Sequence, residues 1–236
     1  MKIQDDFSRY SRQIFIEEIG LEGQKKIRSS KVLVIGAGGL GSPVIQYLAA
    51  AGVGTLGVAD FDHVELHNLN RQIIHTENRV GVSKVKSAET FVRELNHQVA
   101  FIGIEEKLNG NNAEKIISHY DVIVDGSDNF STRYLVNDTC VKLKKTLVYG
   151  SILGFSGQVS VFNHNESKNL RDIFPEPPFD EDVPDCDSLG VLGALPGIIG
   201  SLMALQALKI ITDLPVSVNQ LTLVDTLNWR FQAIDF

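Results

Sequence analysis

The 236-residue chain carries 22 basic and 29 acidic residues, a net charge of −7, and 43% of its residues are hydrophobic. This length suits one large domain or two small ones, and the composition excludes a disordered or fibrous chain. The negative charge argues against a protein whose main task is to grip phosphate backbones, so we expect no nucleic-acid partner.

One segment, residues 164–187, carries most of this charge. It holds eight acidic and two basic residues, a net of −6, together with four of the seven prolines. By composition it is a solvated loop. The rest of the chain is nearly neutral.

The two cysteines, Cys140 and Cys186, cannot build a disulfide framework or a four-cysteine zinc site. No N-terminal stretch has the order of a signal peptide, so a cytoplasmic protein is expected. Residues 188–208 are uncharged and long enough to cross a bilayer. However, Pro196 and several glycines interrupt them, which favours a buried helix that starts near Pro196, and no membrane partner is expected.

In chain order, helices are predicted within residues 5–28, and a buried strand follows at 31–35. Strands and helices then alternate through the first half of the chain, at 42–53 (helix), 55–60 (strand), 84–96 (helix), 99–108 (strand), 111–120 (helix) and 121–128 (strand). This alternation indicates a doubly wound parallel sheet.

The pattern changes after about residue 145. Strands at 146–152 and 157–163 have little between them, a helix covers 196–211, and 221–225 with 229–236 resembles a hairpin. We therefore predict a single-domain α/β fold with a Rossmann-like doubly wound sheet, parallel in its first half and mixed or antiparallel in its second. Residues 1–30 form N-terminal helices, 31–145 a first half and 146–236 a second half.

A glycine loop stands between the first strand and the following helix. Gly36, Gly38 and Gly41 form GxGxxG, and Asp60 ends the next strand. Such glycines let backbone amides approach phosphate at a helix N-terminus, and the acid suits a ribose hydroxyl. The motif predicts nucleotide binding and, taken alone, would suggest an NAD-dependent oxidoreductase.

Two cations argue for a more highly charged ligand. Arg71, close to Asn68 and Gln72, and then Lys84 follow the ribose acid. A triphosphate builds up charge at the phosphorus under attack and on the departing pyrophosphate, and cations stabilise that charge.

The strand at 121–128 ends in polar residues. Asp125, Asp128 and Asn129 stand where parallel strands meet a ligand crevice. Carboxylates there suit Mg²⁺, while Asp128 or Asn129 could equally cap the next helix. The sequence leaves both interpretations open.

At this point the chain resembles the ThiF/MoeB/HesA family, bacterial relatives of the ubiquitin-activating enzymes. The resemblance rests on motifs spread over nearly the whole chain, at 9–14 (RYSRQI), 36–42 (GAGGLGS), 60–72, 80–88, 125–138 and 190–210. It implies an adenylyltransferase that uses ATP and Mg²⁺. The substrate would be the C-terminal Gly-Gly carboxylate of a small ubiquitin-like sulfur-carrier protein, for thiamine thiazole or molybdopterin synthesis.

The resemblance also implies residue roles. Gly39 would lie at the phosphates and Asp60 on the ribose, with Lys84 neutralising the triphosphate and Asp128, beside Asn129, holding Mg²⁺. An N-terminal arginine, here Arg12, would reach into a partner subunit's site, which implies a homodimer. The remaining nucleotide-lining residues would be His67, Asn68, Leu69, Asn70, Arg71 and Gln72, with Asn68 and Arg71 near the phosphates.

The chain departs from the family pattern at two places. Asn169 and Asp172 stand where relatives often carry a zinc-binding cysteine pair, so no structural zinc is expected. Cys186 stands where some relatives use a thiol covalently, although the acids around it should raise its thiol pKa. Cys140 is expected to be buried. By resemblance, 164–187 is a crossover loop over the carrier's tail, expected to be loose without zinc ligands.

Alternative functions remain open. One is adenylation of a small molecule or of a tRNA-linked carboxylate. An NAD-dependent oxidoreductase fits the glycine loop and Asp60, but it does not explain Arg71 or Lys84. The last alternative is a non-catalytic scaffold protein that only docks a ubiquitin-like partner and does not bind ATP. The retained Cys186 and the lack of a fused sulfurtransferase domain favour a role in thiamine synthesis over one in molybdopterin synthesis, but only slightly.

Overall fold

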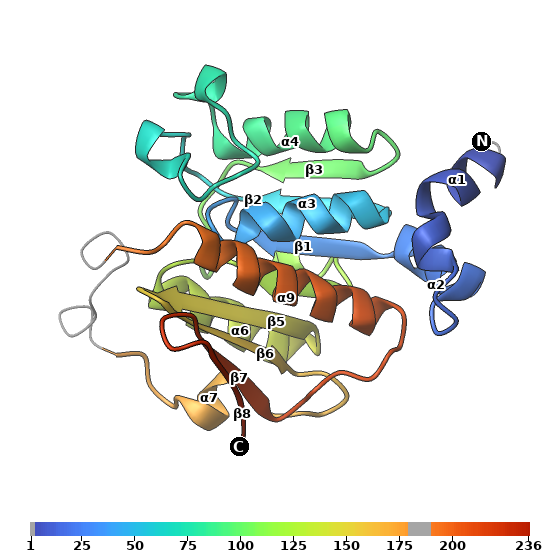
Figure 1. Ribbon diagram of the computed structural model, residues 1–236. Helices are drawn as coiled ribbons and strands as arrows, with labels where there is room; N and C mark the ends of the chain where they lie inside the picture. The colour runs from blue at the N-terminus through green and yellow to red at the C-terminus, as the bar shows by residue number, and fades with distance from the viewer. Residues whose placement is uncertain (1–2, 179–189) are drawn as a thin grey trace.

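The computed structural model describes residues 3–178 and 190–236 (Figure 1). In that part of the chain the strands form one eight-stranded sheet in the order β3-β2-β1-β4-β5-β6-β7-β8. The strands are β1 (Lys31–Ile35), β2 (Thr55–Ala59), β3 (Ala100–Ile104), β4 (Val122–Asp125), β5 (Thr146–Leu153), β6 (Ser156–Phe162), β7 (Gln220–Asp225) and β8 (Arg230–Asp235).

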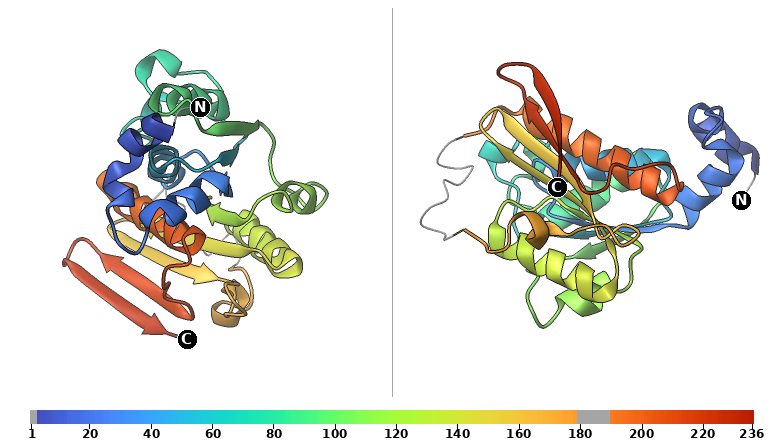
Figure 2. Two further views of the ribbon diagram at one scale, coloured as in Figure 1. Left: turned by 90° about the vertical axis from the view of Figure 1, so that its right-hand side faces the viewer. Right: turned by 90° about the horizontal axis from the view of Figure 1, so that it is seen from below.

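Helices cover both faces of the sheet, as the views of Figure 2 show. One apolar cluster joins α3, α4 and α9 to one face, and a second joins α5 and α6 to the other. The helical elements are α1 (Ile3–Ile14), α2 (Gly20–Ser29), α3 (Gly41–Ala51), η1 (Leu66–Asn68), η2 (Glu77–Arg79), α4 (Lys84–Leu95), α5 (Ala113–Ile117), α6 (Phe130–Leu143), α7 (Leu170–Ile173) and α9 (Ala194–Ile211).

The pairing of neighbouring strands changes once along the sheet, from parallel to antiparallel. Neighbouring strands from β3 to β5 are parallel, whereas β5, β6, β7 and β8 pair antiparallel. Strands β1 and β4 are apolar at nearly every position because helices cover both of their faces. The predicted fold class, parallel first and antiparallel later, is confirmed. Strand β3 and helix α5 are shorter than the predicted 99–108 and 111–120.

The chain order creates a switch point between β1 and β4. From β1 the chain moves outward to β2 and β3, and then returns to the other side of β1 as β4. Loops that leave adjacent strands in opposite directions open a crevice at their carboxyl ends. The fold therefore places the glycine loop after β1 opposite the polar residues after β4.

Helix α9 is long and apolar enough to span a membrane, with a mean hydropathy of 1.7. It lies across the sheet in Figure 1, and Leu195, Ile199 and Met203 on its inner face belong to the apolar core. Gly150 and Gly157 of the sheet leave room for Met203 and Ile199, because a Cβ at either glycine would overlap those side chains. This packing is that of a core helix.

Candidate functional site

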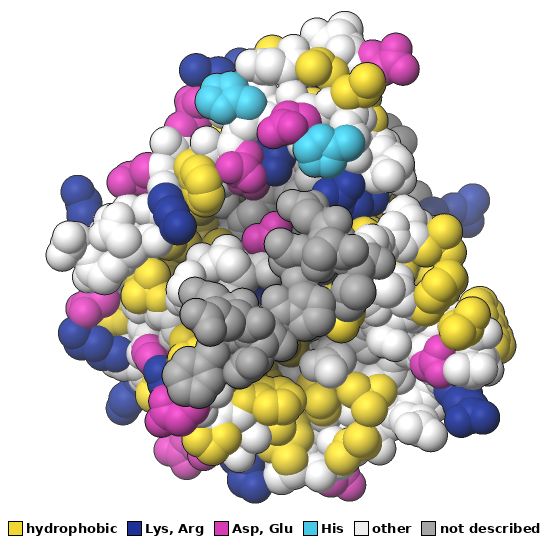
Figure 3. Space-filling view, turned by 90° about the vertical axis from the view of Figure 1, so that its left-hand side faces the viewer, with side chains coloured by type: hydrophobic (Ala, Val, Ile, Leu, Met, Phe, Trp, Pro, Cys, Tyr) yellow, Lys and Arg dark blue, Asp and Glu magenta, His cyan; other side chains and the backbone are white. Residues whose placement is uncertain are grey.

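A cavity of about 400 Å³ opens at the switch point, at the carboxyl ends of β1, β2 and β4. In Figure 3, acidic, basic and histidine side chains gather on the upper part of the face at which these strands end. The predicted site residues that line the cavity are Gly36, Gly38, Gly39, Asp60, Arg71, Gln72, Lys84, Asp128 and Asn129. Residues far apart in the chain thus meet at one place.

The glycine loop depends on close backbone contacts. Gly36 has φ +87°, in the region that favours glycine. A Cβ on Gly41 would lie 1.8 Å from the Gly36 carbonyl oxygen, so no other residue fits there. Gly41 therefore packs the start of α3 against the loop and does not line the cavity, whereas Gly38 and Gly39 do.

Asp60 ends β2 and holds two backbone amides. Its Oδ2 accepts from the Ala37 N–H at 2.7 Å, and its Oδ1 accepts from the Asp62 N–H at 2.8 Å. An ionised carboxylate has further acceptor capacity. Asp60 can therefore stabilise the glycine loop and still accept a hydrogen bond from a ligand hydroxyl in the cavity.

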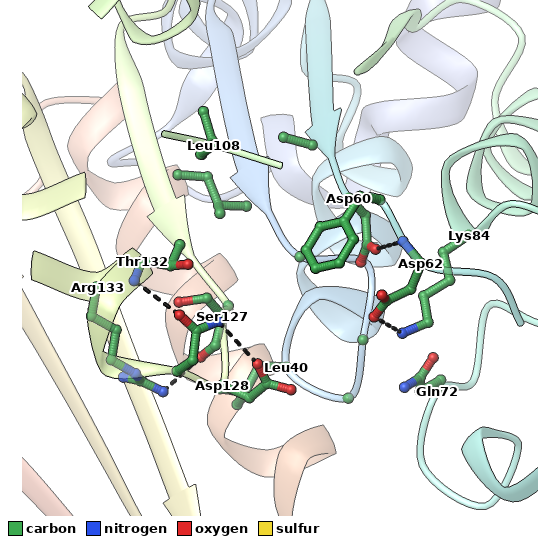
Figure 4. Close-up of a pocket in the computed structure, with 18 of the residues that line it drawn as sticks. Leu40, Asp60, Asp62, Gln72, Lys84, Leu108, Ser127, Asp128, Thr132 and Arg133 are labelled. Atoms are coloured by element: carbon green, nitrogen blue, oxygen red, sulfur yellow. Dashed lines mark hydrogen bonds and ion pairs between the residues drawn. The ribbon is translucent and has the colours of Figure 1, made fainter. Parts of the chain in front are cut away.

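Lys84 begins α4 and is nearly buried. Its side chain is 9% exposed, and its Nζ lies 2.9 Å from Asp62 Oδ2. Asp62, which also lines the cavity, was not identified from the sequence. Figure 4 shows Asp60, Asp62, Lys84 and Gln72 on one wall of the cavity, and Ser127, Asp128, Thr132 and Arg133 on the other.

Arg71 and Gln72 follow η1 on the Lys84 side of the cavity. Arg71 Nη1 donates to the His67 carbonyl at 3.0 Å and to Asn70 Oδ1 at 3.2 Å. Gln72 is 4% exposed, and its Oε1 has no hydrogen-bond partner among the described residues. A buried acceptor left unpaired at a cavity wall costs stability unless a ligand or water donates to it.

Four residues predicted to line the nucleotide do not line the cavity: His67, Asn68, Leu69 and Asn70. Asn68 is buried and its Oδ1 accepts from the Glu65 N–H at 3.0 Å, which stabilises the start of η1. The contacts of His67 and Asn70 to Arg71 place them behind that arginine. His67 and Asn70 therefore support Arg71 and do not line the cavity themselves.

Asp128 and Asn129 have different roles in the structure. Asn129 caps α6, because its Oδ1 accepts from the Thr132 N–H at 2.9 Å. Asp128 is exposed on the cavity wall, and within the described part of the chain its Oδ1 accepts a long hydrogen bond from Asn129 Nδ2 at 3.4 Å. The capping alternative thus holds for Asn129, while Asp128 remains available to a cation.

The wall behind Asp128 contains Arg133 and Ser127, which were not predicted from the sequence, and the predicted Asp125 is buried close to them. Arg133 is buried and donates to the Ser127 and Gly150 carbonyls at 2.6 and 2.8 Å. Asp125 is fully buried, and burial raises its pKa while the Arg133 charge lowers it. Ser127 lines the cavity with an Oγ that has no partner among the described residues. No spacing in the sequence relates Arg133 to the two carbonyls to which it donates.

The end of the cavity that Leu108 lines is apolar. Leu108 lies there in Figure 4, and Ile35 and Ala59 contribute apolar side chains. Phe61 is half-exposed at the same cavity, with Lys107 Nζ 5.5 Å from its ring centroid. An aromatic face and aliphatic neighbours can hold a planar base.

Arg12 does not line the cavity. Arg12 lies on α1, which Figure 1 places at the side of the sheet opposite the strand ends that form the cavity. Its side chain is exposed. Cys186 lies outside the described residues. Cys140 is buried as predicted, and burial raises the pKa of its thiol. Among the described residues no group of three or more His, Cys, Asp or Glu side chains could hold a metal.

The described part of the acidic segment is held by side chains of α6. We call this set the α6–α7 clasp; its members are Tyr134, Asn137, Asp138, Asn169, Arg171 and Asp172. Asn169 and Asp172 form a capping box at α7. Arg171 donates to both oxygens of Asp138 at 2.8 and 2.9 Å, and this lowers the pKa of that carboxyl. Residues 169–176 thus make ordered hydrogen bonds in the structure, while residues 179–187, on which most of the expected looseness falls, lie outside the described chain.

Asn137 is the buried centre of the clasp. Its Oδ1 accepts from the Leu170 N–H at 3.0 Å, and its Nδ2 donates to Asn169 Oδ1 at 3.2 Å. We expect Asn137→Ala to lower the free energy of unfolding by about 1–3 kcal/mol, because the buried Leu170 amide loses its acceptor. Urea unfolding measures this. Asn111→Ala, at an exposed position, is the control, and equal stabilities of the two variants would contradict the clasp.

The cavity and its side chains define a class of protein before any comparison. A doubly wound sheet with a glycine loop, a ribose-side acid and cations at its switch point is a nucleotide-binding α/β protein. The chain belongs to the ThiF family, whose model matches residues 10–236. The family predicted from the motifs is therefore confirmed.

Curated relatives carry a more specific name. The chain is 51% identical over 207 residues to the adenylyltransferase and sulfurtransferase MOCS3 of Culex quinquefasciatus, covering 88% of this chain and 47% of that protein. It is 49% identical over 230 residues to the protein of the same name from Xenopus laevis, covering 97% and 51%. The chain thus spans about half the length of the curated relatives it matches.

Solved structures share the fold. MccB from E. coli, solved with ATP, has a TM-score of 0.84 at 20% identity, covering 96% of this chain and 71% of that chain. PaaA also has a TM-score of 0.84 at 20% identity, covering 100% and 74%. At these identities the likeness shows the fold alone.

Proposed function

We propose that this chain is an adenylyltransferase that uses ATP and Mg²⁺ to activate a carboxylate. The observation that carries the proposal is the meeting of Arg71, Lys84 and Asp128 around the glycine loop in one cavity. The three side chains come from separate segments, and together they offer two cations and one carboxylate to a phosphate chain. The relatives named as adenylyltransferases support this activity.

The cavity fits ATP in both size and chemistry. Its volume of about 400 Å³ lies within the range of small-molecule sites. The apolar end at Phe61 and Leu108 suits the base, Asp60 suits the ribose, and the glycine loop suits the phosphates. Gln72, whose Oε1 has no partner among the described residues, also lines this cavity, so that the nucleotide could donate a hydrogen bond to it.

In this reaction the chain positions the carboxylate and the ATP, and it stabilises the charge on the phosphates. The carboxylate oxygen attacks the α-phosphorus, an acyl-adenylate forms, and the bond to pyrophosphate breaks. Lys84 has to exchange Asp62 for a phosphate oxygen, and Arg71 adds a second cation. Such charge stabilisation in a shielded site accelerates reactions strongly. Asp128 would hold Mg²⁺, which supplies further charge neutralisation to the phosphates.

For the carboxylate we propose the C-terminal Gly-Gly of a ubiquitin-like sulfur carrier. The relatives' names combine adenylyl and sulfur transfer, which supports a sulfur carrier over a small molecule or a tRNA. Carriers of the thiazole and the molybdopterin type are the two to test. A homodimer is part of the proposal, because Arg12 cannot reach the cavity of its own chain and a second copy would supply it. We place the protein in the cytoplasm.

The test is ATP–pyrophosphate exchange with purified carriers that end in Gly-Gly. We expect exchange that requires Mg²⁺ and is lost when the carrier's last glycine is deleted. Exchange with a free amino acid but with no carrier would favour the small-molecule alternative. Tight NAD binding with no ATP binding would replace the proposal by the oxidoreductase.

A further inference from the structure

His75 is a buried histidine directly behind the glycine loop. It is 5% exposed and does not line the cavity. Its Nε2 lies 2.9 Å from the Ala37 carbonyl oxygen, and its Nδ1 lies 2.8 Å from Ser87 Oγ. A carbonyl oxygen can only accept, so Nε2 carries the proton and, in the neutral ring, Nδ1 accepts from the Ser87 hydroxyl.

The surroundings of His75 favour this neutral ring. Burial lowers the pKa of His75, and the charges of Lys84 and Arg79 act in the same direction. The Ala37 carbonyl and Asp60 act in the opposite direction and do not outweigh them. With one tautomer set by its two partners, the ring has a single donor, and that donor faces the loop.

The backbone of Ala37 is held on both sides, through the peptide group before it and the peptide group after it. The Ala37 N–H donates to Asp60 Oδ2 at 2.7 Å, and the Ala37 carbonyl accepts from His75. In a trans peptide the carbonyl and the following N–H point in opposite directions. The Gly38 N–H therefore points away from His75, and Gly38 lines the cavity. Glycines alone would leave this peptide free to rotate.

The same ring reaches α4. Ser87 lies one turn after Lys84, and its carbonyl accepts from Arg79 Nη1 at 3.1 Å. His75 thus joins the glycine loop to the helix that begins with Lys84. One buried side chain therefore contacts both the glycine loop and α4.

We propose that His75 is a positioning residue for phosphate: it holds the Ala37 carbonyl so that the Gly38 amide faces the phosphate oxygens of a bound nucleotide. This rests on the proposed ATP site and deepens it. The ring touches neither ligand nor metal. Its effect is confined to ligands that carry phosphate, because only they meet the amide that it orients.

The test compares adenosine with ATP in the presence of Mg²⁺, using titration calorimetry on wild type, His75→Leu and His75→Gln. We expect His75→Leu to weaken ATP binding by about tenfold or more, since a buried carbonyl loses its donor, and to change adenosine binding less than about twofold. His75→Gln keeps a donor N–H and should restore most of the loss. His119→Leu, an exposed histidine on the other side of the sheet, is the matched control and should bind both ligands as wild type does.

Other outcomes overturn the inference. Equal weakening of ATP and adenosine would show that His75 supports only the general fold, and unchanged ATP binding would show that it does not orient the amide. If His75→Leu does not fold, Ser87→Ala removes the hydroxyl that donates to Nδ1 and holds the ring against α4. That variant should show the same selective loss at about two- to fivefold, and wild-type ATP binding would overturn the inference. Absence of ATP binding by wild type would instead reject the ATP site itself.

Discussion

Replacing Lys84 by methionine is expected to lower the rate of ATP–pyrophosphate exchange by about 10²–10³-fold, the loss typical of removing one charge-stabilising donor. The side chain is 9% exposed and its ammonium is held at the cavity wall by Asp62. Methionine keeps the length of the stem but removes the charge. Steady-state exchange with saturating carrier measures the effect.

The Lys84 variant is expected to stay folded. Its ion-pair partner Asp62 is half-exposed, so the lone carboxylate can be solvated, and methionine fills the nearly buried position of Lys84 without a charge. Lys86→Met is the matched control, because Lys86 stands on the same helix, is 64% exposed and pairs with Glu105 outside the cavity. Equal activities of the two variants would remove Lys84 from the site.

Asp128→Asn is expected to lower Mg²⁺-dependent exchange by about 100-fold, because an amide holds Mg²⁺ far less well than a carboxylate. Raising the Mg²⁺ concentration should recover part of the rate, since the remaining ligands are phosphate oxygens and waters. Among the residues that the structure describes, the exposed side chain makes one weak hydrogen bond, with Asn129, so the melting temperature should stay near that of wild type. A magnesium titration of the exchange rate measures both effects.

A second aspartate separates a local effect from a general loss of charge. Asp213, with φ +55° after α9, lies at the helix end opposite Ala194 and pairs with Lys26. Asparagine tolerates this backbone region, so Asp213→Asn should keep both the fold and the exchange rate. If Asp128→Asn keeps wild-type magnesium dependence, the metal assignment fails.

The order of elements along the sheet was accessible from the sequence because helix and strand periodicities differ. Apolar runs such as 31–35 predict strands buried on both faces, and β1 is such a strand. The position of the cavity followed as well, since carboxyl ends of parallel strands meet at a switch point. Asp60, Lys84 and Asp128 were found because each stands at the end or start of a predicted element.

Residues that act through contacts between distant segments were not accessible in this way. Asp62 pairs with Lys84 across 22 residues of chain, and Arg133 bridges the Ser127 and Gly150 carbonyls. Neither relation has a periodicity or a spacing that the sequence displays. Conversely, Asn68 stands next to Arg71 in sequence, but in the structure it stabilises η1.

By itself, the sequence determined the family, the fold class and the two cations Arg71 and Lys84 that line the cavity, because these depend on local pattern and on motifs. Only the tertiary structure decided which role each of these side chains has. Asn129 became a helix cap while Asp128 stayed available, and the acidic segment gained the α6–α7 clasp. His75, which no motif in the sequence singled out, donates a hydrogen bond to the glycine loop. The reason is physical: hydrogen bonds between buried groups depend on distances that only the packed chain sets.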